Sequence, residues 1–274
     1  MKIKANYHTH HKMCGHAKGN TYDYVKMAKE ANLEVIGMSD HLYIPKSFMS
    51  ESYYKSFWLD EQMDEKGFFE YIDEVNDAKL KNPDIKILLG AETEYISGKL
   101  DYYTWAKKHL DYLLVGIHYF EYKNKFYSTY DPMDKELLIA YTDVLVEAIN
   151  TNFFTIAVHP DLFMYNYTGD NGHLEFDKTC EECSKRIIEA AIKNDVYLEI
   201  NCGCFNKSKK TPNNKEYLYP RSEFWKIASK YDCKVVIGVD AHKPEELIGE
   251  GVKIALNFAK ENNIKLVNKI DCFK

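Results

Sequence analysis

Segments with strand character alternate with helical patterns along almost the whole chain. The expected strands are Ile3–His8, Glu34–Asp40, Ile85–Glu92, Tyr112–His118, Phe154–His159, Val196–Asn201 and Val235–Asp240, with a weaker candidate at Ile264–Val267. The expected helices are Thr21–Asn32, Phe68–Lys81, Leu100–His109, Asp134–Asn150, Thr179–Asn194, Ser222–Lys230 and Glu245–Asn262. Such alternation is typical of a parallel sheet, and seven or eight units favour closure into a barrel. Because 274 residues suit one such barrel, we expect a single α/β domain over residues 1–274.

The longest segment without an expected element is Leu42–Gly67, which follows the second strand. It is rich in aromatic residues, namely Tyr43, Phe48, Tyr53, Tyr54, Phe57 and Trp58. A long loop after the C-terminal end of a strand is where a substrate lid would lie. An insertion that packs on itself is an equally good interpretation.

The histidines are concentrated where the expected strands end. Seven of the ten lie at the C-terminal end of a strand or in the loop that follows, and two acids at strand ends complete the pattern. The C-terminal strand ends of a parallel barrel meet at one mouth, where active sites are found. We therefore expect a metal site with the candidate ligands His8, His10, His16, His41, Glu92, His118, His159, Asp240 and His242.

Two pairs of these candidates show the period of an extended chain. His8 and His10 are two residues apart, as are Asp240 and His242, so each pair faces one side of its segment. Any single histidine is more often a satisfied core or loop residue than a ligand, so the argument rests on the coincidence across six strands. The remaining histidines fall outside the pattern and are expected on the surface: His11, His109 and His173.

The kinds of ligand indicate the metal and the charge of the substrate. Imidazole and carboxylate groups without thiolates suit zinc, manganese or iron. Nine ligands are too many for one ion with an open position, so we expect two or three divalent ions. Three such ions, offset by two carboxylates and one hydroxide, would leave a charge of about +3 that favours a phosphate dianion. This matters because the chain has only two arginines, Arg186 and Arg221.

The overall charge argues against some partners. The net charge is −6, from 36 basic and 42 acidic residues, whereas binding to long nucleic acids or membrane surfaces needs a basic surface. The sequence starts without the apolar segment of a signal peptide, and no apolar run approaches the length of a membrane span. The seven cysteines are an odd number and are expected as reduced thiols. We therefore expect a cytoplasmic protein with a small phosphorylated substrate; the oligomeric state stays open.

Seven short motifs carry a resemblance to a known family. They are His8-Thr9-His10, Cys14-Gly15-His16-Ala17, Ser39-Asp40-His41, Gly90-Ala91-Glu92, Gly116-Ile117-His118, Val158-His159-Pro160-Asp161 and Val239-Asp240-Ala241-His242. In this order, and over nearly the whole chain, they resemble the polymerase and histidinol phosphatase (PHP) family. The CGHA motif and the chain length are most similar to the histidinol-phosphate phosphatases. The resemblance implies a distorted (β/α)7 barrel, similar to a TIM barrel, with a trinuclear metal site.

The resemblance also implies how the ligands are shared. His8, His10, Glu92 and Asp240 would hold the first ion. Glu92 would bridge to a second ion, which His118 and His159 complete, and the third would be held by His16, His41 and His242. A hydroxide between the first two ions would attack phosphorus. Candidates for protonating the leaving alkoxide are Asp161 and His41.

One departure from the family pattern affects the substrate. In similar histidinol phosphatases an arginine follows the Glu-Ile-Asn strand, whereas here Asn201 is followed a few residues later by Asn206 and Lys207. Arg221 in the next loop could supply the missing charge, but lysine does not replace the two-pronged guanidinium. The expected substrate-binding residues are therefore Asn201, Lys207 and Arg221. Phosphoesterase chemistry is unaffected, while L-histidinol phosphate, the best single substrate, is less firmly indicated.

Two alternatives to a monoesterase stay open. The same metals could serve a nucleotide phosphodiester or a nucleoside bisphosphate, or the barrel could bind metals without catalysis. Near the site, Glu94 and Glu199 would either orient ligands or lie deeper in the barrel. Cys202 and Cys204 are interpreted as small buried residues rather than soft ligands.

Overall fold

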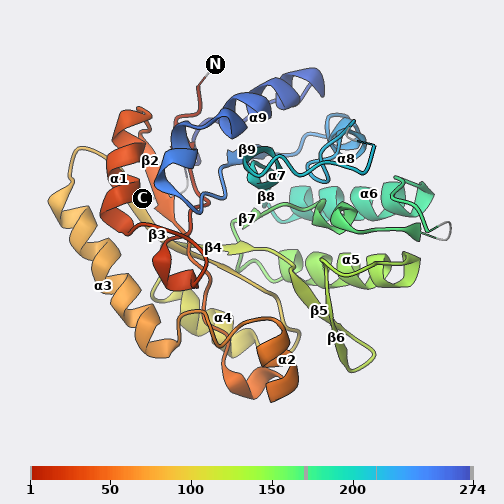
Figure 1. The fold of residues 1–274 in the computed structure, drawn as a ribbon, viewed down its shortest axis with the longest axis horizontal. Helices are drawn as coiled ribbons and strands as arrows, with labels where there is room; N and C mark the ends of the chain where they lie inside the picture. The colour runs from red at the N-terminus through yellow and green to blue at the C-terminus, as the bar shows by residue number, and fades with distance from the viewer. Residues whose placement is uncertain (1, 170–171, 214, 272–274) are drawn as a thin grey trace.

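Seven parallel strands wrap into a nearly closed barrel that helices cover on the outside (Figure 1). The structure, a computed structural model, describes residues 2–169, 172–213 and 215–271. The strands are β1 (Ala5–Asn6), β2 (Val35–Met38), β3 (Lys86–Thr93), β4 (Tyr112–Val115), β5 (Tyr119–Tyr122), β6 (Lys125–Ser128), β7 (Ile156–Ala157), β8 (Tyr197–Asn201) and β9 (Val235–Gly238). The α-helices are α1 (Thr21–Glu30), α2 (Glu51–Ser56), α3 (Glu65–Lys81), α4 (Leu100–Lys107), α5 (Lys135–Asn150), α6 (Lys178–Lys193), α7 (Gly203–Asn206), α8 (Ser222–Ala228) and α9 (Glu250–Glu261). Short 3-10 helices are η1 (Lys12–Cys14), η2 (Lys46–Phe48), η3 (Leu162–Tyr165) and η5 (Pro244–Ile248).

Local sequence signals start several of these helices. Asn20 and Asp23 form a reciprocal capping box at α1, in which each side chain accepts a hydrogen bond from the other residue's backbone N–H. Asp64, Asp134 and Asp177 each accept a hydrogen bond from the N–H three residues later, and they cap α3, α5 and α6. The caps fix where each helix begins and so how long each loop at the mouth of the barrel can be.

The barrel closes through a side chain as well as through backbone pairing. The strand order is β1-β2-β3-β4-β7-β8-β9, and a bridge between Thr9 and Ala241 joins the last strand to the first at the C-terminal end. Below this bridge, Asn6 Oδ1 accepts a 2.9 Å hydrogen bond from the backbone N–H of Val239, and Asn6 Nδ2 donates to Thr9 Oγ1 at 2.7 Å. The side chain of Asn6 thus replaces a missing strand-to-strand contact.

Two apolar clusters separate the inside of the barrel from the outside. The larger cluster joins one face of the strands to the helices. A second cluster contains no helical residue and includes Tyr7, Leu88, Tyr112, Tyr197 and Val236, which fill the barrel interior. Because alternate strand residues share a face, the face of Leu88 continues to residue 92 of the same strand. Side chains at the mouth of the barrel, such as that of Glu92, thus lie directly above the apolar cluster that fills the interior.

The structure differs from the sequence-based expectations in several places, including the short helices α2 and α7, which were not expected. A hairpin of β5 and β6 was not expected; its turn is Lys123-Asn124, both with positive φ (50° and 59°), as in a two-residue hairpin turn. The expected strand at Ile264–Val267 is wrong: only Leu266 forms a bridge, to Val235. The expected helix at 245–262 is broken at Gly249 into η5 and α9.

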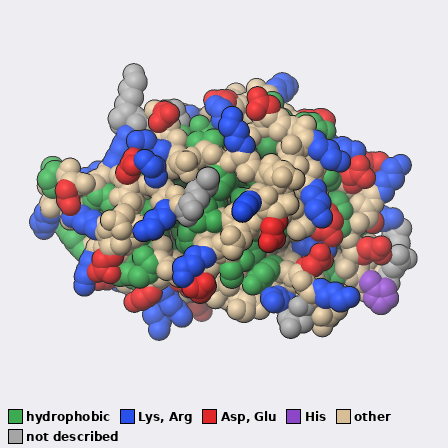
Figure 2. Space-filling model, turned by 90° about the horizontal axis from the view of Figure 1, so that it is seen from above, with side chains coloured by type: hydrophobic (Ala, Val, Ile, Leu, Met, Phe, Trp, Pro, Cys, Tyr) green, Lys and Arg blue, Asp and Glu red, His purple; other side chains and the backbone are tan. Residues whose placement is uncertain are grey.

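Three observations concern the surface, the hydropathy of the helices and the state of the cysteines. On the face shown in Figure 2, Lys and Arg side chains are interspersed with Asp and Glu, and the described residues form no extended basic area there. No helix within the described residues is long and apolar enough to cross a membrane. Six cysteines are free thiols, and Cys272 lies outside the described residues.

Replacing Asn6 with alanine is expected to lower the free energy of unfolding by about 1–3 kcal/mol, because it leaves the buried N–H of Val239 without an acceptor. Urea unfolding followed by circular dichroism measures the change. Asn76→Ala on the exposed face of α3 is the control and should change stability little. Equal stability of the two variants would contradict a role for Asn6 in closing the barrel.

Candidate metal centre

The barrel brings the nine predicted ligands together at one mouth. Eight of them lie at or just beyond the C-terminal end of a strand, and His16 lies in the loop after η1. Glu92 is at the centre of the group and is 1% exposed. Five imidazoles approach its carboxylate within 3.6 Å: His159 at 2.9 Å, His41 at 3.2 Å, His10 at 3.3 Å, His8 at 3.4 Å and His118 at 3.6 Å.

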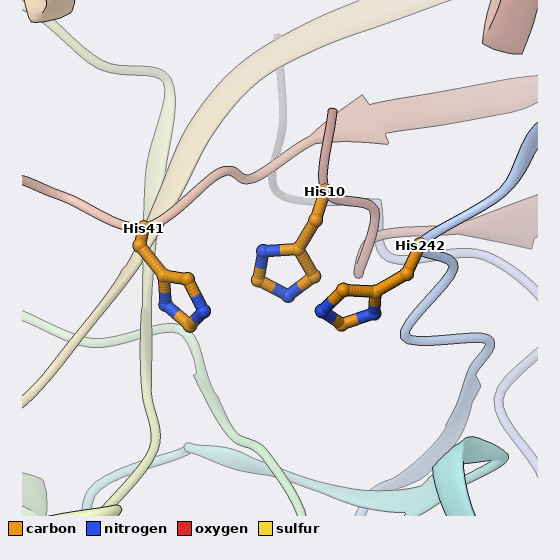
Figure 3. A group of neighbouring side chains, drawn as sticks. All are labelled: His10, His41 and His242. Carbon is orange, nitrogen blue, oxygen red and sulfur yellow. The ribbon is translucent and has the colours of Figure 1, made fainter. Parts of the chain in front are cut away.

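Three sets of donor atoms are compact enough to hold one metal ion each. In each set the donor atoms lie within 4.8 Å of one another, and the sets are His8–His10–Glu92, Glu92–His118–His159 and His10–His41–His242. Figure 3 shows the third set, with three rings from separate segments pointing toward one another. A fourth group joins His10 to Cys14 and Asp40.

These sets resemble the ligand sharing that the family motifs imply. Asp240 Oδ1 lies 3.3 Å from His10 Nε2 and 3.6 Å from His8 Nε2, beside the first set. In the third set His10 stands where His16 was expected. The ring of His16 lies 4.9 Å from that of His242, at the edge of the same set.

The Nδ1 atoms of four of these histidines contact carboxylates or backbone carbonyl oxygens outside the donor sets. His8 Nδ1 lies 2.8 Å from Glu199, and His118 Nδ1 lies 2.6 Å from Glu94. The Nδ1 atoms of His16 and His242 donate to backbone carbonyl oxygens at 2.9 and 3.0 Å. Such contacts leave the Nε2 atoms directed to the centre, as in histidines that bind metals. Glu94 and Glu199 thus contact the rings of two candidate ligands, as one of the two interpretations of the sequence requires.

The electrostatics of the cluster favour bound cations. Burial disfavours the charged form of His118, but the charges of Glu94 and Glu92 outweigh it and raise its pKa to about 9. Burial would likewise raise the pKa of Glu92, yet the surrounding imidazoles hold it well below its usual range. Burial and the charge on His10 lower the pKa of His242 to about 3, which keeps this imidazole neutral. Glu92 is therefore ionised and His242 is neutral, which are the protonation states in which these groups bind metal ions.

The donor set fits divalent metal ions. Its members are imidazole nitrogens and carboxylate oxygens; His8, His10, Glu92, His159 and Asp240 are buried. The Nε2 atoms of His8 and His10 face each other at 3.0 Å. Nitrogen and oxygen donors of this kind suit zinc, manganese or iron. Cys202 and Cys204 are buried and belong to none of the donor sets, in agreement with their interpretation as small core residues.

The backbone around the ligands is unusual. Asp240 and His159 both have positive φ (51° and 33°), a conformation that costs energy for residues other than glycine and is concentrated at functional sites. Two glycines make room for the carboxylates. A Cβ at Gly116 would lie 2.4 Å from Glu92 Oε1, and one at Gly238 would lie 1.6 Å from Glu199 Oε1. The strands are thus adapted to carry acids inside the barrel.

Replacing Glu94 with glutamine is expected to weaken metal binding or activity about 10- to 100-fold, because the amide no longer fixes the ring of His118 with a charge-assisted contact. Metal titration monitored by calorimetry and phosphate release both report the effect. Glu121→Gln on β5, an exposed residue, is the matched control. If both variants bound metal as wild type does, the contact between Glu94 and His118 would have no functional part.

Asn201, Lys207 and Arg221, the expected substrate-binding residues, belong to none of the donor sets. Asn201 is buried; its Nδ2 donates to Glu199 at 2.8 Å. Lys207 is exposed, and its charge contributes to the lowered pKa of His242, after burial and His10. The guanidinium of Arg221 is buried and pairs with two carboxylates, Glu216 and Glu223.

Asp161, a candidate proton donor, is turned toward Arg221. Its Oδ2 accepts a 2.6 Å hydrogen bond from the backbone N–H of Arg221, and burial raises its pKa to about 7. The other candidate donor, His41, lies within the cluster, with its Nδ1 3.2 Å from Glu92.

The surface assignment of His11 is wrong. This residue is fully buried, and its Nδ1 lies 2.5 Å from Oδ2 of Asp40. The other oxygen of Asp40 lies 3.5 Å from His10 Nδ1, so one acid stands between two histidines. The sequence argument assumed that His11, which points away from His10, would face water. In the structure its ring packs against the ring of Tyr71. His173 is exposed as expected, and His109 is half-buried.

A cavity of about 830 Å³ opens beside the cluster. Glu92, His16, His41 and His118 line it on one side, and the segment 42–62 together with the β5–β6 hairpin lines much of the rest. The aromatic segment after β2 therefore packs against its neighbours and forms a wall of the cavity. Its role as a substrate lid stays a prediction.

A parallel α/β barrel with imidazoles and carboxylates gathered at its mouth is the architecture of a barrel metalloenzyme. The chain belongs to the PHP domain family, whose model matches residues 6–203. The resemblance drawn from the motifs is therefore confirmed, and so is the predicted α/β barrel.

Several relatives agree with this assignment. A probable histidinol-phosphatase of Schizosaccharomyces pombe is 24% identical over 261 residues, which are 90% of this chain and 82% of the relative. A probable histidinol-phosphatase of Deinococcus radiodurans is 24% identical and covers 88% of this chain and 86% of its own. These relatives confirm the predicted enzyme class, a phosphoric monoester hydrolase.

Two solved structures share the fold. A candidate histidinol phosphatase from Listeria monocytogenes superposes with a TM-score of 0.73 at 19% identity, covering 92% of this chain and 99% of its own. Histidinol phosphate phosphatase from Lactococcus lactis, solved with zinc, L-histidinol and phosphate, gives a TM-score of 0.68 at 17% identity, covering 97% and 96%.

Proposed function

We propose that this protein hydrolyses a small phosphate monoester, with L-histidinol phosphate as the first substrate to test, and that it uses two or three divalent transition-metal ions. The observation that carries the proposal is the approach of five imidazoles to the buried carboxylate of Glu92. Ions bound there would supply an activated hydroxide and offset the charge of the phosphate oxygens.

Residues of the chain are assigned to metal binding, to the orientation of ligands and to proton transfer. Glu92 is shared by two donor sets, so it would hold two ions at a fixed separation, and Asp240 beside the first set would complete it. Glu94 and Glu199 keep the rings of His118 and His8 in place. His41 lines the cavity, but it belongs to the third donor set, and burial and the charge on His10 hold its pKa well below the usual range, so it carries no acidic proton. We therefore favour Asp161, whose pKa burial raises to about 7, for protonation of the leaving alkoxide.

The choice of L-histidinol phosphate rests on the relatives and is the finer part of the proposal. The Lactococcus lactis structure holds zinc, L-histidinol and phosphate, and the two curated relatives carry the name histidinol-phosphatase. This chain differs from similar enzymes after β8, where Asn206 and Lys207 stand in place of an arginine. Arg221 is already paired with two acids, so positive charge for the phosphate would come mainly from the metals.

A cytoplasmic location and small phosphorylated partners follow from the same proposal. The net charge of −6 and the interspersed charges of Figure 2 suit a small substrate better than a long nucleic acid. A phosphodiesterase is the second candidate, since the same metals would serve a nucleotide diester, and the large cavity beside the cluster supports it.

A substrate panel tests the proposal. The purified protein is incubated with manganese or zinc and with L-histidinol phosphate, other monoesters, a nucleoside bisphosphate and bis(4-nitrophenyl) phosphate, and phosphate or nitrophenol release is measured. We expect the monoesters to be hydrolysed faster than the diester, with L-histidinol phosphate the best. A faster diester would favour the second candidate. No turnover with any ester, in protein shown to contain metal, would favour a non-catalytic barrel.

A further inference from the structure

A buried carboxylate lies behind the metal centre, on the side away from the cavity. Asp40 is fully buried between two consecutive histidines: its Oδ1 lies 3.5 Å from His10 Nδ1, and its Oδ2 lies 2.5 Å from His11 Nδ1. Burying a carboxylate is costly unless it is paired, so these two imidazoles are what permits its burial. Asp40 and His11 belong to none of the three donor sets around Glu92 and the histidines, and neither lines the cavity.

His10 has a special place among the candidate ligands. It belongs to both the first and the third donor set, whereas within the described residues each of the other imidazoles belongs to only one of the three sets. Its Nε2 lies 3.0 Å from His8 Nε2 and 3.3 Å from the carboxylate of Glu92, and its ring stands beside those of the third set (Figure 3). A change in the orientation of this one ring would therefore affect two ions at once.

The second nitrogen of His10 faces Asp40. Within the described residues no hydrogen bond to this Nδ1 is formed at ordinary geometry, and Asp40 Oδ1 at 3.5 Å is the carboxylate oxygen that it faces. A histidine that binds a metal usually donates its other N–H to a carboxylate or a carbonyl oxygen, which fixes the direction of the ring. A small rotation of the ring would bring Nδ1 and Oδ1 to hydrogen-bonding distance, so Asp40 is placed to take this part.

A fourth metal ion is a poorer interpretation of the same group. The donor atoms of His10, Cys14 and Asp40 are close enough to hold one. An ion there would need a ring nitrogen of His10 as well as the nitrogen directed to the other sets. A neutral imidazole offers only one nitrogen that accepts, because the other carries the proton. The geometry thus favours Asp40 as a hydrogen-bond acceptor.

Asp40 itself is held from three neighbouring strands. Its Oδ1 accepts a 2.9 Å hydrogen bond from the backbone N–H of His41, just after β2. On its other side lies His11, in the segment after β1, whose ring packs edge to face on Tyr71 at 5.0 Å and 89°. The hydroxyl of Tyr71 donates a 2.8 Å hydrogen bond to the backbone oxygen of Gly90 on β3. The carboxylate is therefore fixed in place by residues that are themselves fully buried or on the backbone.

We propose that Asp40 is the positioning residue for His10, which it orients toward the ions of the first and third donor sets, and that His11 holds Asp40 in place. The inference deepens the proposed function and rests on it in one respect, namely that the centre binds metal ions. It goes further by assigning work to two buried residues outside the donor sets, and by linking the occupancy of two ions to one carboxylate.

Titration of metal-free protein with cobalt(II) tests the proposal. Cobalt takes nitrogen and oxygen ligands of this kind, and its visible absorption bands depend on the geometry of the ligands. Calorimetry gives the affinity of each binding step. Asp40→Asn keeps the size of the side chain but removes its charge. It should weaken every step except that of the second set about 10- to 100-fold and shift the absorption bands. Glu94→Gln, which disturbs His118, should weaken the step of the second set alone.

Variants of His11 test the second half of the proposal. His11→Phe keeps an aromatic ring against Tyr71 but removes the nitrogen beside Asp40. It should weaken the same steps as Asp40→Asn, about two- to tenfold, the size of one hydrogen-bonding contact. His11→Asn, whose amide nitrogen takes about the place of Nδ1, should restore part of the affinity. If Asp40→Asn does not fold, the comparison of these two variants decides the question.

The matched control is Thr142→Val on α5. Thr142 is also fully buried, and its Oγ1 donates a 2.9 Å hydrogen bond to the backbone oxygen of Leu138, away from the donor sets. This variant should lower the melting temperature but keep the cobalt affinities and the absorption bands of wild type. Wild-type affinities and bands in Asp40→Asn, or weakening confined to the step that Glu94→Gln weakens, would overturn the proposal.

The titration needs no turnover, which separates this proposal from the proposed function. A wild-type protein that binds cobalt but hydrolyses no ester would reject the hydrolase assignment, while the pattern of weakened steps would still decide the part of Asp40. An active wild type whose Asp40 and His11 variants bind cobalt normally would reject the positioning alone. A wild type that binds no cobalt would reject both.

Discussion

Replacing Glu92 with glutamine is expected to lower kcat/KM for phosphate release by about a thousandfold while the fold is retained. The carboxylate belongs to two donor sets and is approached by five imidazoles, so the neutral amide would weaken the binding of two ions at once. Loss of several kcal/mol of metal-derived transition-state stabilisation corresponds to about three factors of ten in rate. Steady-state kinetics and metal analysis of the same preparation measure the effect.

The control for this experiment is Glu189→Gln, which removes an exposed carboxylate on α6 far along the chain from the cluster. It should keep both the metal content and the rate of wild type. Circular dichroism of the Glu92 variant should match wild type, because glutamine fits the space that Gly116 leaves beside residue 92. A Glu92→Gln enzyme with more than about a tenth of wild-type activity would show that the chemistry does not depend on this centre.

Removing the metals with a chelator is expected to abolish phosphate release and to lower the melting temperature by about 5–10 °C. Ligands that bind only the folded state contribute about 3 kcal/mol when present at a hundred times their dissociation constant. For a chain of this size each kcal/mol corresponds to about 2–4 °C.

Reconstitution distinguishes metal loss from damage by the chelator. Manganese or zinc added back should restore both activity and melting temperature, while magnesium should restore less because it prefers oxygen ligands. The Glu92→Gln variant should show a smaller shift than wild type on chelation. Unchanged activity and melting temperature in metal-free wild type would be incompatible with the proposed centre.

The candidate ligands were predictable from the sequence because two simple rules act together. Parallel strands end at one mouth, and residues two apart on an extended chain face the same side, so His8, His10, Asp240 and His242 had to meet. The same rule placed Glu199 on the face of Asn201, which is why orienting a ligand was one of its two interpretations; which ligand it contacts, His8, was not predicted.

Other features depend on packing that no short pattern records. His11 is buried because the outer face of its segment meets Asp40 and Tyr71, which lie on other elements. The β5–β6 hairpin was missed because it is short. Asn124 at its turn is a residue type typical of hairpin turns, but the regular alternation of strands and helices directed attention away from it. Much of the cavity wall comes from two segments far apart in the chain whose rings pack together, as those of Phe57 and Tyr119 do. Sequence periodicity has no means of pairing such rings.

The separate packing of the cavity wall has an evolutionary consequence. Phe57, Tyr119 and their neighbours are supported by their own apolar cluster, whereas the metal ligands stand on the strands of the barrel. Substitutions that reshape one unit need not disturb the other. A lineage could therefore exchange the alcohol that it accepts by altering the wall alone, and retain an ancestral hydrolytic centre unchanged.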